Sequence, residues 1–247
     1  MDILIIEEAV IMYFANKRKN KVLMELNEKI KLVTERLQAL YGDFSFENRS
    51  TNTLNDPFWS IVETILSQNT TFKNSHQAFT KLVSKYHTID ELLGADVHEI
   101  EILIRNAGLF RSKSHRILHL ADIIKNRCNG DASQLLIGSY VDARKRLMKV
   151  KGIGPKTADV VLLFSCRYDI VPIDTHIFRV SKRIGIVPQN GNYEIVKSTL
   201  ENGIPQGKRG YAHMAFIKFG REVCHARNPD HAACPLTDIC DYFQSKK

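Results

Sequence analysis

Apolar residues recur along most of the chain with the spacing of one face of an α-helix. Asp56 is typical of a helix N-cap, and Pro57 of the first helical position. Five apolar side chains follow this start at i, i+3, i+4, i+7 and i+8: Phe58, Ile61, Val62, Ile65 and Leu66. The pattern therefore predicts a helix that begins at Pro57.

The same period returns in later segments, with start signals of its own. Thr88-x-x-Glu91 and Asp96-x-x-Glu99 have the spacing of capping boxes before apolar positions. Four further helices are expected over residues 114–125, 143–150, 156–166 and 211–223. Convincing strand patterns are few, so the sequence predicts an all-α fold.

The stretch Lys151-Gly152-Ile153-Gly154-Pro155-Lys156-Thr157-Ala158 places a glycine turn between two of these helices. Gly152 and Gly154 can adopt backbone angles that other residues avoid, which lets the chain turn tightly and lie close to a ligand. Pro155 suits the first position of the next helix. The free N–H groups of such a helix start form an anion site. The stretch therefore predicts a phosphate-binding turn.

Two charged residues lie at helix starts near this turn. Lys156 is in the first turn of its helix, where the macrodipole disfavours a cation, so a partly desolvated lysine there is a usable amine nucleophile. Asp174, in Ile173-Asp174-Thr175-His176, has the place of an N-cap that stays ionised. Together they could act on a carbon electrophile. An ordinary helix–turn–helix connection and a plain cap are the alternatives.

These segments resemble the endonuclease III family, within the DNA glycosylase superfamily of base excision repair. Residues 152–162 are similar to its helix-hairpin-helix, and residues 171–180 to the Gly/Pro-Asp loop that follows. Leu66-Ser67-Gln68-Asn69-Thr70-Thr71 resembles the family's lesion-site helix end, and Ala107-Gly108-Leu109-Phe110-Arg111-Ser112-Lys113 its wedge loop. The resemblance extends over roughly residues 40 to 243.

The resemblance implies two helical domains with a DNA-binding cleft between them. Residues 55–168 are expected to form a six-helix bundle that holds the helix-hairpin-helix. Residues 1–54 and 169–247 are expected to form a discontinuous helical domain that ends in an iron–sulfur-type ligand loop. Residues 1–25 lie beyond the resemblance; they are a loosely attached helix with a solvated charge run at Lys17 to Lys21, or a tail that contacts DNA.

The resemblance also implies a reaction. Lys156 attacks C1′ of the flipped nucleotide and displaces the damaged base, which gives a Schiff base, and β-elimination then cuts the strand 3′ to the lesion. Ionised Asp174 stabilises positive charge on the sugar. Relatives without an amine at the position of Lys156 cleave the backbone poorly, so this lysine predicts a bifunctional DNA glycosylase and abasic-site lyase.

Five positions and the hairpin glycines are implied to contact DNA. A flipped base leaves a gap that the enzyme must fill. Leu109 resembles the apolar wedge, although a core leucine is the alternative. Gln68 or Asn69 would fill the vacated stack, and the sequence leaves the choice open, as it does a plain helix cap. Lys151 could add a phosphate contact next to Gly152 and Gly154, and His176 is either a DNA contact or an ordinary first-turn residue.

Three of the five cysteines, Cys224, Cys234 and Cys240, crowd the C-terminus. An odd number without a secretory signal argues against a disulfide framework and suggests a metal. Family members typically carry four cysteines here, separated by six, two and five residues, which hold a [4Fe–4S] cluster. This chain keeps that spacing only with His231 as the second ligand. A cluster with three Cys and one His, zinc, a cluster with an open iron site, and no metal all stay open.

The composition indicates what kind of partner to expect. The net charge of +8 and the pI near 9.2 favour a polyanion, here double-stranded DNA with base damage or abasic sites. No apolar run is long enough for a membrane span, and a cytoplasmic, nucleoid-associated monomer is expected. Oxidised pyrimidines are the expected substrates. A mismatch or 8-oxoguanine glycosylase and a non-catalytic helix-hairpin-helix DNA-binding protein are the alternatives.

Overall fold

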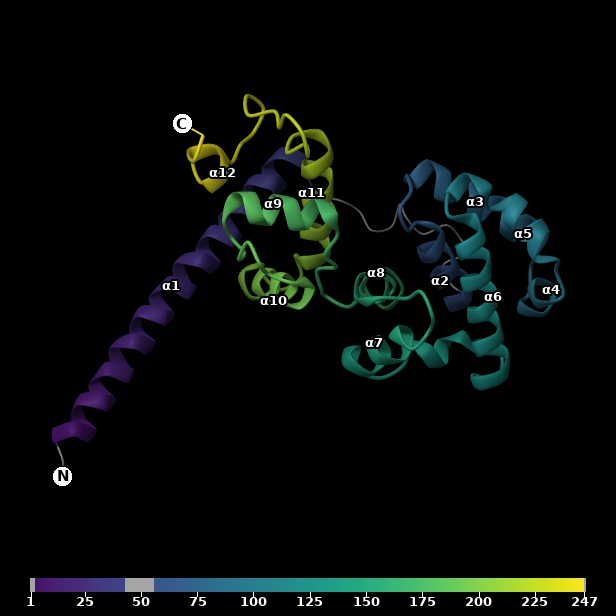
Figure 1. The fold of residues 1–247 in the computed structure, drawn as a ribbon, viewed down its shortest axis with the longest axis horizontal. Coiled ribbons are helices and arrows are strands. Elements are labelled where there is room, and N and C mark those ends of the chain that lie inside the picture. Colours follow the sequence, from purple (N-terminus) through teal and green to yellow (C-terminus); the bar gives the residue numbers. More distant parts are fainter. Residues whose placement is uncertain (1–2, 43–55, 247) are drawn as a thin grey trace. The chain divides into compact units, whose positions relative to one another are not determined.

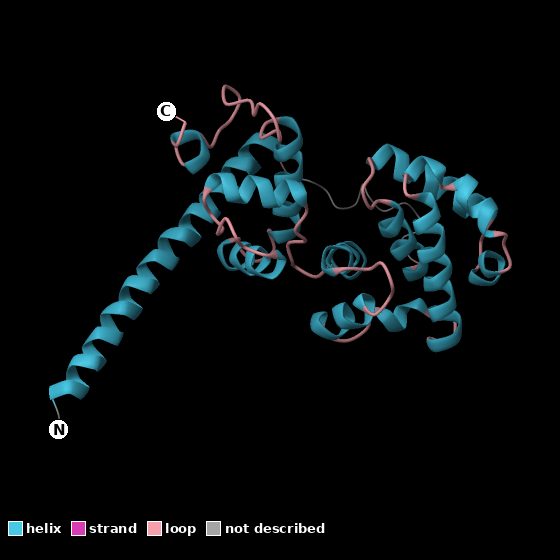
Figure 2. Ribbon diagram, in the orientation of Figure 1, coloured by secondary structure: helices cyan, strands magenta, loops and turns pink. Residues whose placement is uncertain are grey.

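The computed structural model describes residues 3–42 and 56–246, with side chains from residue 22 onward. That part of the chain consists of helices and the loops between them, without a strand (Figure 2). The predicted all-α fold is therefore confirmed. No helix among the described residues is both long and apolar enough to cross a membrane.

The chain divides into two compact units (Figure 1). One comprises Met1–Phe44 and Asp169–Lys247, and the other comprises Ser45–Tyr168. We call the first the terminal unit and the second the hairpin unit. The terminal unit contains α1 (Ile3–Tyr41), α9 (Thr175–Ile184), α10 (Tyr193–Gly203), α11 (Arg209–Glu222) and α12 (Asp241–Gln244). The hairpin unit contains α2 (Pro57–Leu66), α3 (Phe72–Lys85), α4 (Ile89–Leu93), α5 (Val97–Leu103), η3 (Arg105–Ala107), α6 (Phe110–Arg127), η4 (Ala132–Leu135), α7 (Tyr140–Met148) and α8 (Pro155–Cys166).

The core of the terminal unit forms where α1 packs on α10 and α11. Ile30, Val33 and Leu37 of α1 are fully buried in an apolar cluster with side chains of α9 to α11. Further toward the N-terminus α1 extends beyond the other helices of this unit (Figure 1). The charge run at Lys17 to Lys21 belongs to that extension, and its side chains lie outside the described residues.

Several helix starts in the hairpin unit are those that the sequence predicts. Asp56 accepts a hydrogen bond from the Phe58 N–H and begins α2. Thr88 caps α4 through the Glu91 N–H, but the Glu91 carboxylate accepts from the His87 N–H rather than from that of Thr88. The predicted capping box is therefore wrong in its second bond, because the carboxylate reaches one residue further back.

Several boundaries and three α-helices differ from the sequence prediction. Helix α6 begins at Phe110, four residues before the predicted start at Ser114, and α7 begins at Tyr140 because Ser139 caps it. Helices α3, α10 and α12 were not predicted; Asn192 starts α10 by accepting from the Ile195 N–H. Polar caps thus account for the starts of α7 and α10, whereas α6 begins without a side-chain cap bond.

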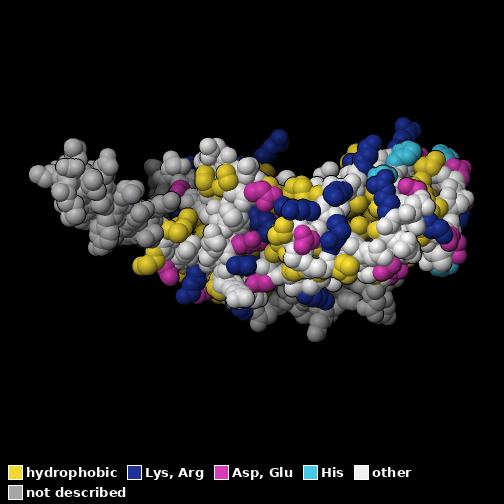
Figure 3. All heavy atoms as spheres, turned by 90° about the horizontal axis from the view of Figure 1, so that it is seen from below, with side chains coloured by type: hydrophobic (Ala, Val, Ile, Leu, Met, Phe, Trp, Pro, Cys, Tyr) yellow, Lys and Arg dark blue, Asp and Glu magenta, His cyan; other side chains and the backbone are white. Residues whose placement is uncertain are grey.

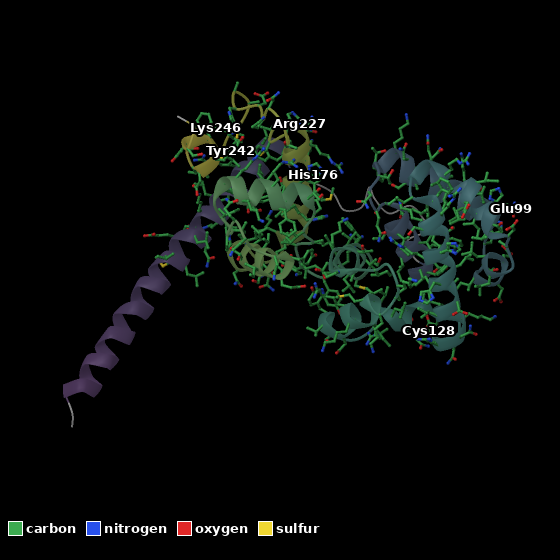
Figure 4. The ribbon with its side chains drawn as sticks, viewed as in Figure 1. Glu99, Cys128, His176, Arg227, Tyr242 and Lys246 are labelled. Atoms are coloured by element: carbon green, nitrogen blue, oxygen red, sulfur yellow. The ribbon has the colours of Figure 1, made fainter. Side chains whose placement is uncertain are left out.

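Glu99 of α5 joins α5 to the end of α3 (Figure 4). Its carboxylate accepts a 2.6 Å hydrogen bond from the Tyr86 hydroxyl and pairs with Lys85. The hydrogen bond from Lys85, and then that from Tyr86, lowers the pKa of Glu99 below its ordinary value of 4.5. Burial, followed by the bond to Glu99, raises the pKa of Tyr86 to about 12.

We expect the contribution of Glu99 to stability to depend on pH. A carboxyl group whose folded pKa is depressed contributes above its unfolded value and loses that contribution as pH falls through the folded pKa. Glu99→Gln should therefore lower the urea midpoint above about pH 5, and the difference should shrink as pH falls below 4.5. A double-mutant cycle with Tyr86→Phe isolates the pair. A coupling that is equal at both ends of this pH range would contradict the assignment.

Candidate active site

Helices α7 and α8 lie side by side and are joined by the glycine turn (Figure 1). Gly152 has φ of +91°, in the region that favours glycine. Gly154 has φ of −91°, so the expectation of unusual backbone angles at both glycines is wrong for Gly154. A Cβ at Gly154 would meet no atom within 4 Å, whereas one at Gly152 would lie 2.4 Å from Cδ of Arg116.

The Gln68 side chain, just after α2, and the Arg116 side chain of α6 brace the turn. The Gln68 side-chain amide donates to the carbonyl oxygen of Gly152 at 3.2 Å and to the Thr157 hydroxyl at 3.0 Å. Its own oxygen accepts from Nη1 of Arg116 at 2.6 Å. The glycine turn, the end of α2 and one face of α6 therefore form one hydrogen-bonded network.

Lys156 lies in the first turn of α8, one residue before Thr157, and is half-buried. The helix starts at Gly154, which has no side chain to cap it. A helix start of this kind, with its outward N–H groups, suits an anion such as a phosphate. Lys151 is exposed on the same turn. The local structure thus combines an anion-binding helix end with two lysines.

Asp174 is the N-cap of α9, in the terminal unit. Its carboxylate accepts a 2.9 Å hydrogen bond from the Ile177 N–H. The loop before it is fixed by three hydrogen bonds, to Glu201, Tyr193 and His213. The buried His213 ring contacts the Pro172 carbonyl oxygen at 2.7 Å, two residues before Asp174. The carboxylate is therefore held in place before any substrate binds.

His176 lies at the start of α9 (Figure 4). Its Nδ1 lies 3.1 Å from Nη2 of Arg179, and a Cβ at Gly220 of α11 would come within 2.8 Å of its own Cβ. Burial is the main reason that the pKa of His176 is lowered. The ring is therefore packed within the terminal unit and is uncharged near neutral pH.

The turn after α2 and the loop before α6 share an uncommon backbone conformation. Asn69 has φ of +51° and Leu109 has φ of +49°, and both are exposed. The Leu109 side chain is 57% exposed, so the alternative of a core leucine is wrong. Gln68 and Asn69 also differ, because the Gln68 amide is engaged with the hairpin whereas Asn69 faces solvent.

The four candidate metal ligands line one small pocket after α11. Cys224, His231, Cys234 and Cys240 enclose it together with apolar residues such as Phe219, Val223 and Leu236. The ring of His231 packs edge-on against Phe243 with 4.7 Å between ring centres. Among the described side chains, no three of His, Cys, Asp or Glu lie close enough together to form a group around a single metal ion, so the fit rests on which donors share this pocket.

Burial, and the nearby Cys240 and Cys224 as lesser causes, raise the pKa of the Cys234 thiol. A metal would remove this penalty, because thiolates are stabilised by coordination. Three thiols and an imidazole around a mostly apolar pocket have the donor chemistry of an iron–sulfur or zinc site. The residues present therefore fit such a group.

Helix α9 holds the ligand loop through two arginines that the sequence pattern did not single out. Arg183 donates to Sγ of Cys224 at 3.4 Å and to the carbonyl oxygens of His225 and Ala226, and it stacks on Tyr242. Arg179 donates to the carbonyl oxygens of Gly220 and Cys224. Their i, i+4 spacing on a helix was the available signal.

Helix α1 holds the same loop from a second direction. Arg36 pairs with Asp238 and donates to the Pro235 carbonyl oxygen, and Lys29 pairs with Asp241. Asp241 in turn packs over Gly185, where a Cβ would lie 1.7 Å from its carboxylate oxygen. The loop that carries Arg227, with Tyr242 and Lys246 in and after α12, thus lies against α1 and α9 (Figure 4).

The basic charge of the chain is not gathered into one patch on the face that Figure 3 shows. Lys and Arg side chains alternate there with acidic and hydrophobic ones. Charge alone therefore does not mark a nucleic-acid surface on that face. The local geometry of the hairpin is the better indication of where DNA binds.

Comparison with known proteins first gives the class. The family model described as HhH-GPD superfamily base excision DNA repair protein matches residues 62–206. That span contains the glycine hairpin, Lys156 and Asp174. The fold and the site thus define a helix-hairpin-helix protein of base excision DNA repair.

The relatives give the family. Endonuclease III of Rickettsia felis is 33% identical over 212 residues, which cover 85% of this chain and 95% of the relative. Endonuclease III of Sulfolobus acidocaldarius is 32% identical over 229 residues, which cover 91% and 96%. The iron–sulfur binding domain of endonuclease III matches residues 224–240. The chain belongs to the endonuclease III family.

A solved structure agrees with this result. A trapped endonuclease III–DNA covalent intermediate superposes with a TM-score of 0.76 at 27% identity, covering 89% of this chain and 98% of that one. The predicted family, and with it a DNA glycosylase and abasic-site lyase of base excision repair, is confirmed. An iron–sulfur binding segment is confirmed as well.

Proposed function

We propose that the protein excises oxidised pyrimidines from double-stranded DNA, as a cytoplasmic monomer, and cuts the strand at the resulting abasic site. The observation that carries this proposal is Lys156, in the first turn of the helix that follows the glycine turn, in a chain of the endonuclease III family. An amine at that place supplies the nucleophile that covalent strand cleavage needs.

The reaction uses Lys156 and Asp174 as a pair. The neutral amine of Lys156 attacks C1′ and the bond to the damaged base breaks, so the base leaves with the bonding electrons. Loss of an amine proton leaves C1′ bonded to both nitrogen and O4′. The C1′–O4′ bond then breaks, O4′ takes up a proton, and the opened sugar carries the Schiff base. Removal of a C2′ proton then expels the 3′ phosphate. Asp174, oriented by the Ile177 N–H, stabilises positive charge on the sugar as the base departs.

We expect Lys156→Ala to abolish the covalent intermediate. Incubation with duplex that contains thymine glycol or an abasic site, followed by borohydride, should yield a protein–DNA adduct with wild type and none with the variant. Asp174→Asn keeps the helix cap and should slow base release by roughly a hundredfold or more. Duplexes with 8-oxoguanine or mispairs test the other substrate classes. Undiminished strand cleavage by Lys156→Ala would sink the Schiff-base mechanism.

Asn69, rather than Gln68, is proposed to fill the stack that the flipped nucleotide leaves. Asn69 is exposed at the tip of its turn, whereas the Gln68 amide is bonded to Gly152 and Thr157. Exposed Leu109 serves as the wedge. The turn from Lys151 to Gly154 binds the DNA backbone, and the packed His176 borders the lesion pocket.

The two amides should respond differently to removal. Asn69→Gly is expected to slow excision from duplex DNA by about tenfold with little change in the unfolding free energy, because the positive φ of this position suits glycine and only an exposed side chain is lost. Gln68→Ala should lower the unfolding free energy by about 1–3 kcal/mol, because the Gly152 carbonyl and Arg116 lose their partner. Chemical denaturation and single-turnover kinetics separate the two effects. The reverse pattern would assign the gap to Gln68.

His231 is proposed as the fourth ligand of a [4Fe–4S] cluster, with Cys224, Cys234 and Cys240. All four line one pocket, and His231 keeps the sequence spacing of the family's second ligand. A cluster separates its ligands over several irons, which suits residues that surround a shared space. When bound, the cluster would order the loop around Arg227 rather than take part in the covalent step.

Metal content tests this ligand set. His231→Ala should lower iron per chain and the visible absorbance typical of iron–sulfur proteins, whereas His231→Cys should retain both. His225→Ala is the matched control, since His225 is adjacent to Cys224 but off the spacing. Elemental analysis that finds zinc instead of iron would replace the cluster with a Cys₃His zinc site. Unchanged iron content in His231→Ala would remove His231 from the set.

A further inference from the structure

Lys113 is a lysine of α6 that the proposed reaction does not use. Its side chain is fully buried, at 0% exposure. Its ammonium group donates to three carbonyl oxygens, those of Leu66 at 2.8 Å, Gln68 at 2.6 Å and Ala107 at 2.8 Å. An ammonium has three N–H donors, so each is used once.

The three carbonyl oxygens come from two different loops. Leu66 is the last residue of α2, and Gln68 directly precedes Asn69. Ala107 ends η3, two residues before Leu109. The backbone N–H of Lys113 also donates to the Leu109 carbonyl oxygen at 2.9 Å. Lys113 is therefore bonded to both loops, next to the proposed gap filler Asn69 in one and to the proposed wedge Leu109 in the other.

Both loops have a positive φ at the residue that faces outward. Asn69 and Leu109 have φ of +51° and +49°, a conformation that asparagine tolerates better than most residues but that costs free energy for leucine. Such strain persists only where the surrounding structure determines the backbone. The charge-assisted bonds from Lys113 act next to both positions and supply that constraint.

Burial of the charged Lys113 side chain costs free energy. Burial, and secondly the nearby Arg116, lower the pKa of Lys113 to about 8. Carbonyl oxygens at the end of a helix favour a cation and offset part of the cost. Arg116, three residues along the same helix, extends the connection to the hairpin through Gln68 and its packing over Gly152.

We propose that Lys113 is a positioning residue for base extrusion, which fixes the Asn69 turn and the Leu109 loop at one mutual distance. This inference rests on the proposed function, because it gives these two residues their roles on DNA. If Lys113 only satisfied buried carbonyls, its removal would weaken the fold and leave extrusion by the folded protein unchanged.

The test measures extrusion without glycosidic chemistry. A duplex that carries a tetrahydrofuran abasic analogue opposite 2-aminopurine reports unstacking of the opposing base by fluorescence. Lys113→Met, of similar length but without donors, should slow this signal by about tenfold or more while binding to undamaged duplex changes less than about twofold. Lys125→Met is the matched control, because this lysine of α6 pairs with Asp90 at the far end of the helix.

Lys113→Gln covers the case in which Lys113→Met does not fold. Its amide can donate to two carbonyl oxygens, but its shorter side chain cannot span both loops, so extrusion should be slowed here as well. Wild-type extrusion by either folded variant overturns the inference. Failure of both variants to fold overturns it too, because Lys113 would then serve the whole unit rather than the two loops.

A wild-type control keeps the two proposals distinguishable. If wild-type protein gives no borohydride adduct with a true abasic site, the proposed function has failed, whatever the Lys113 variants do. If wild type forms the adduct and Lys113→Met extrudes the base at the wild-type rate, only the role of Lys113 is lost. The inference stands when the adduct forms and extrusion alone is slowed.

Discussion

The hairpin unit depends on the close approach of Arg116 to Gly152. No Cβ fits at Gly152, and its positive φ turns its carbonyl oxygen toward the Gln68 amide. Because Gln68 also bonds to Thr157, the residue after Lys156, the same network holds the first turn of α8. A larger residue in place of the glycine would strain the backbone and displace the Arg116 side chain, which would loosen the network between α2, α6 and α8.

In the terminal unit, helix α9 has a similar organising role. Its first residue follows Asp174, and its later turns carry Arg179 and Arg183, which hold the ligand loop. The helix is ten residues long, about 15 Å at the usual rise. An ordered ligand loop and a correctly placed Asp174 are therefore linked through one rigid element, even though the loop takes no part in the proposed chemistry.

The apolar period and the start signals predicted most helices, because burial of one face and capping are local properties of the sequence. The caps at Asp56, Thr88 and Asp174 are where the sequence places them. The partners of Gln68 and Arg183 could not be predicted, since they join residues 41 to 89 positions apart. Lys113 offered a signal that was missed, a charged residue four positions before Ile117 on the buried face of its helix.

The ion pairs between α1 and the segment from Asp238 to Asp241 have a consequence for how the chain folds. Lys29 and Asp241 are 212 positions apart, and Arg36 and Asp238 are 202 apart, so α1 is synthesised long before these partners. The hairpin unit is continuous in sequence and can fold as soon as it leaves the ribosome. The terminal unit must wait for the segment of Asp238 and Asp241, and we expect α1 to need protection from non-native contacts until that segment has been synthesised.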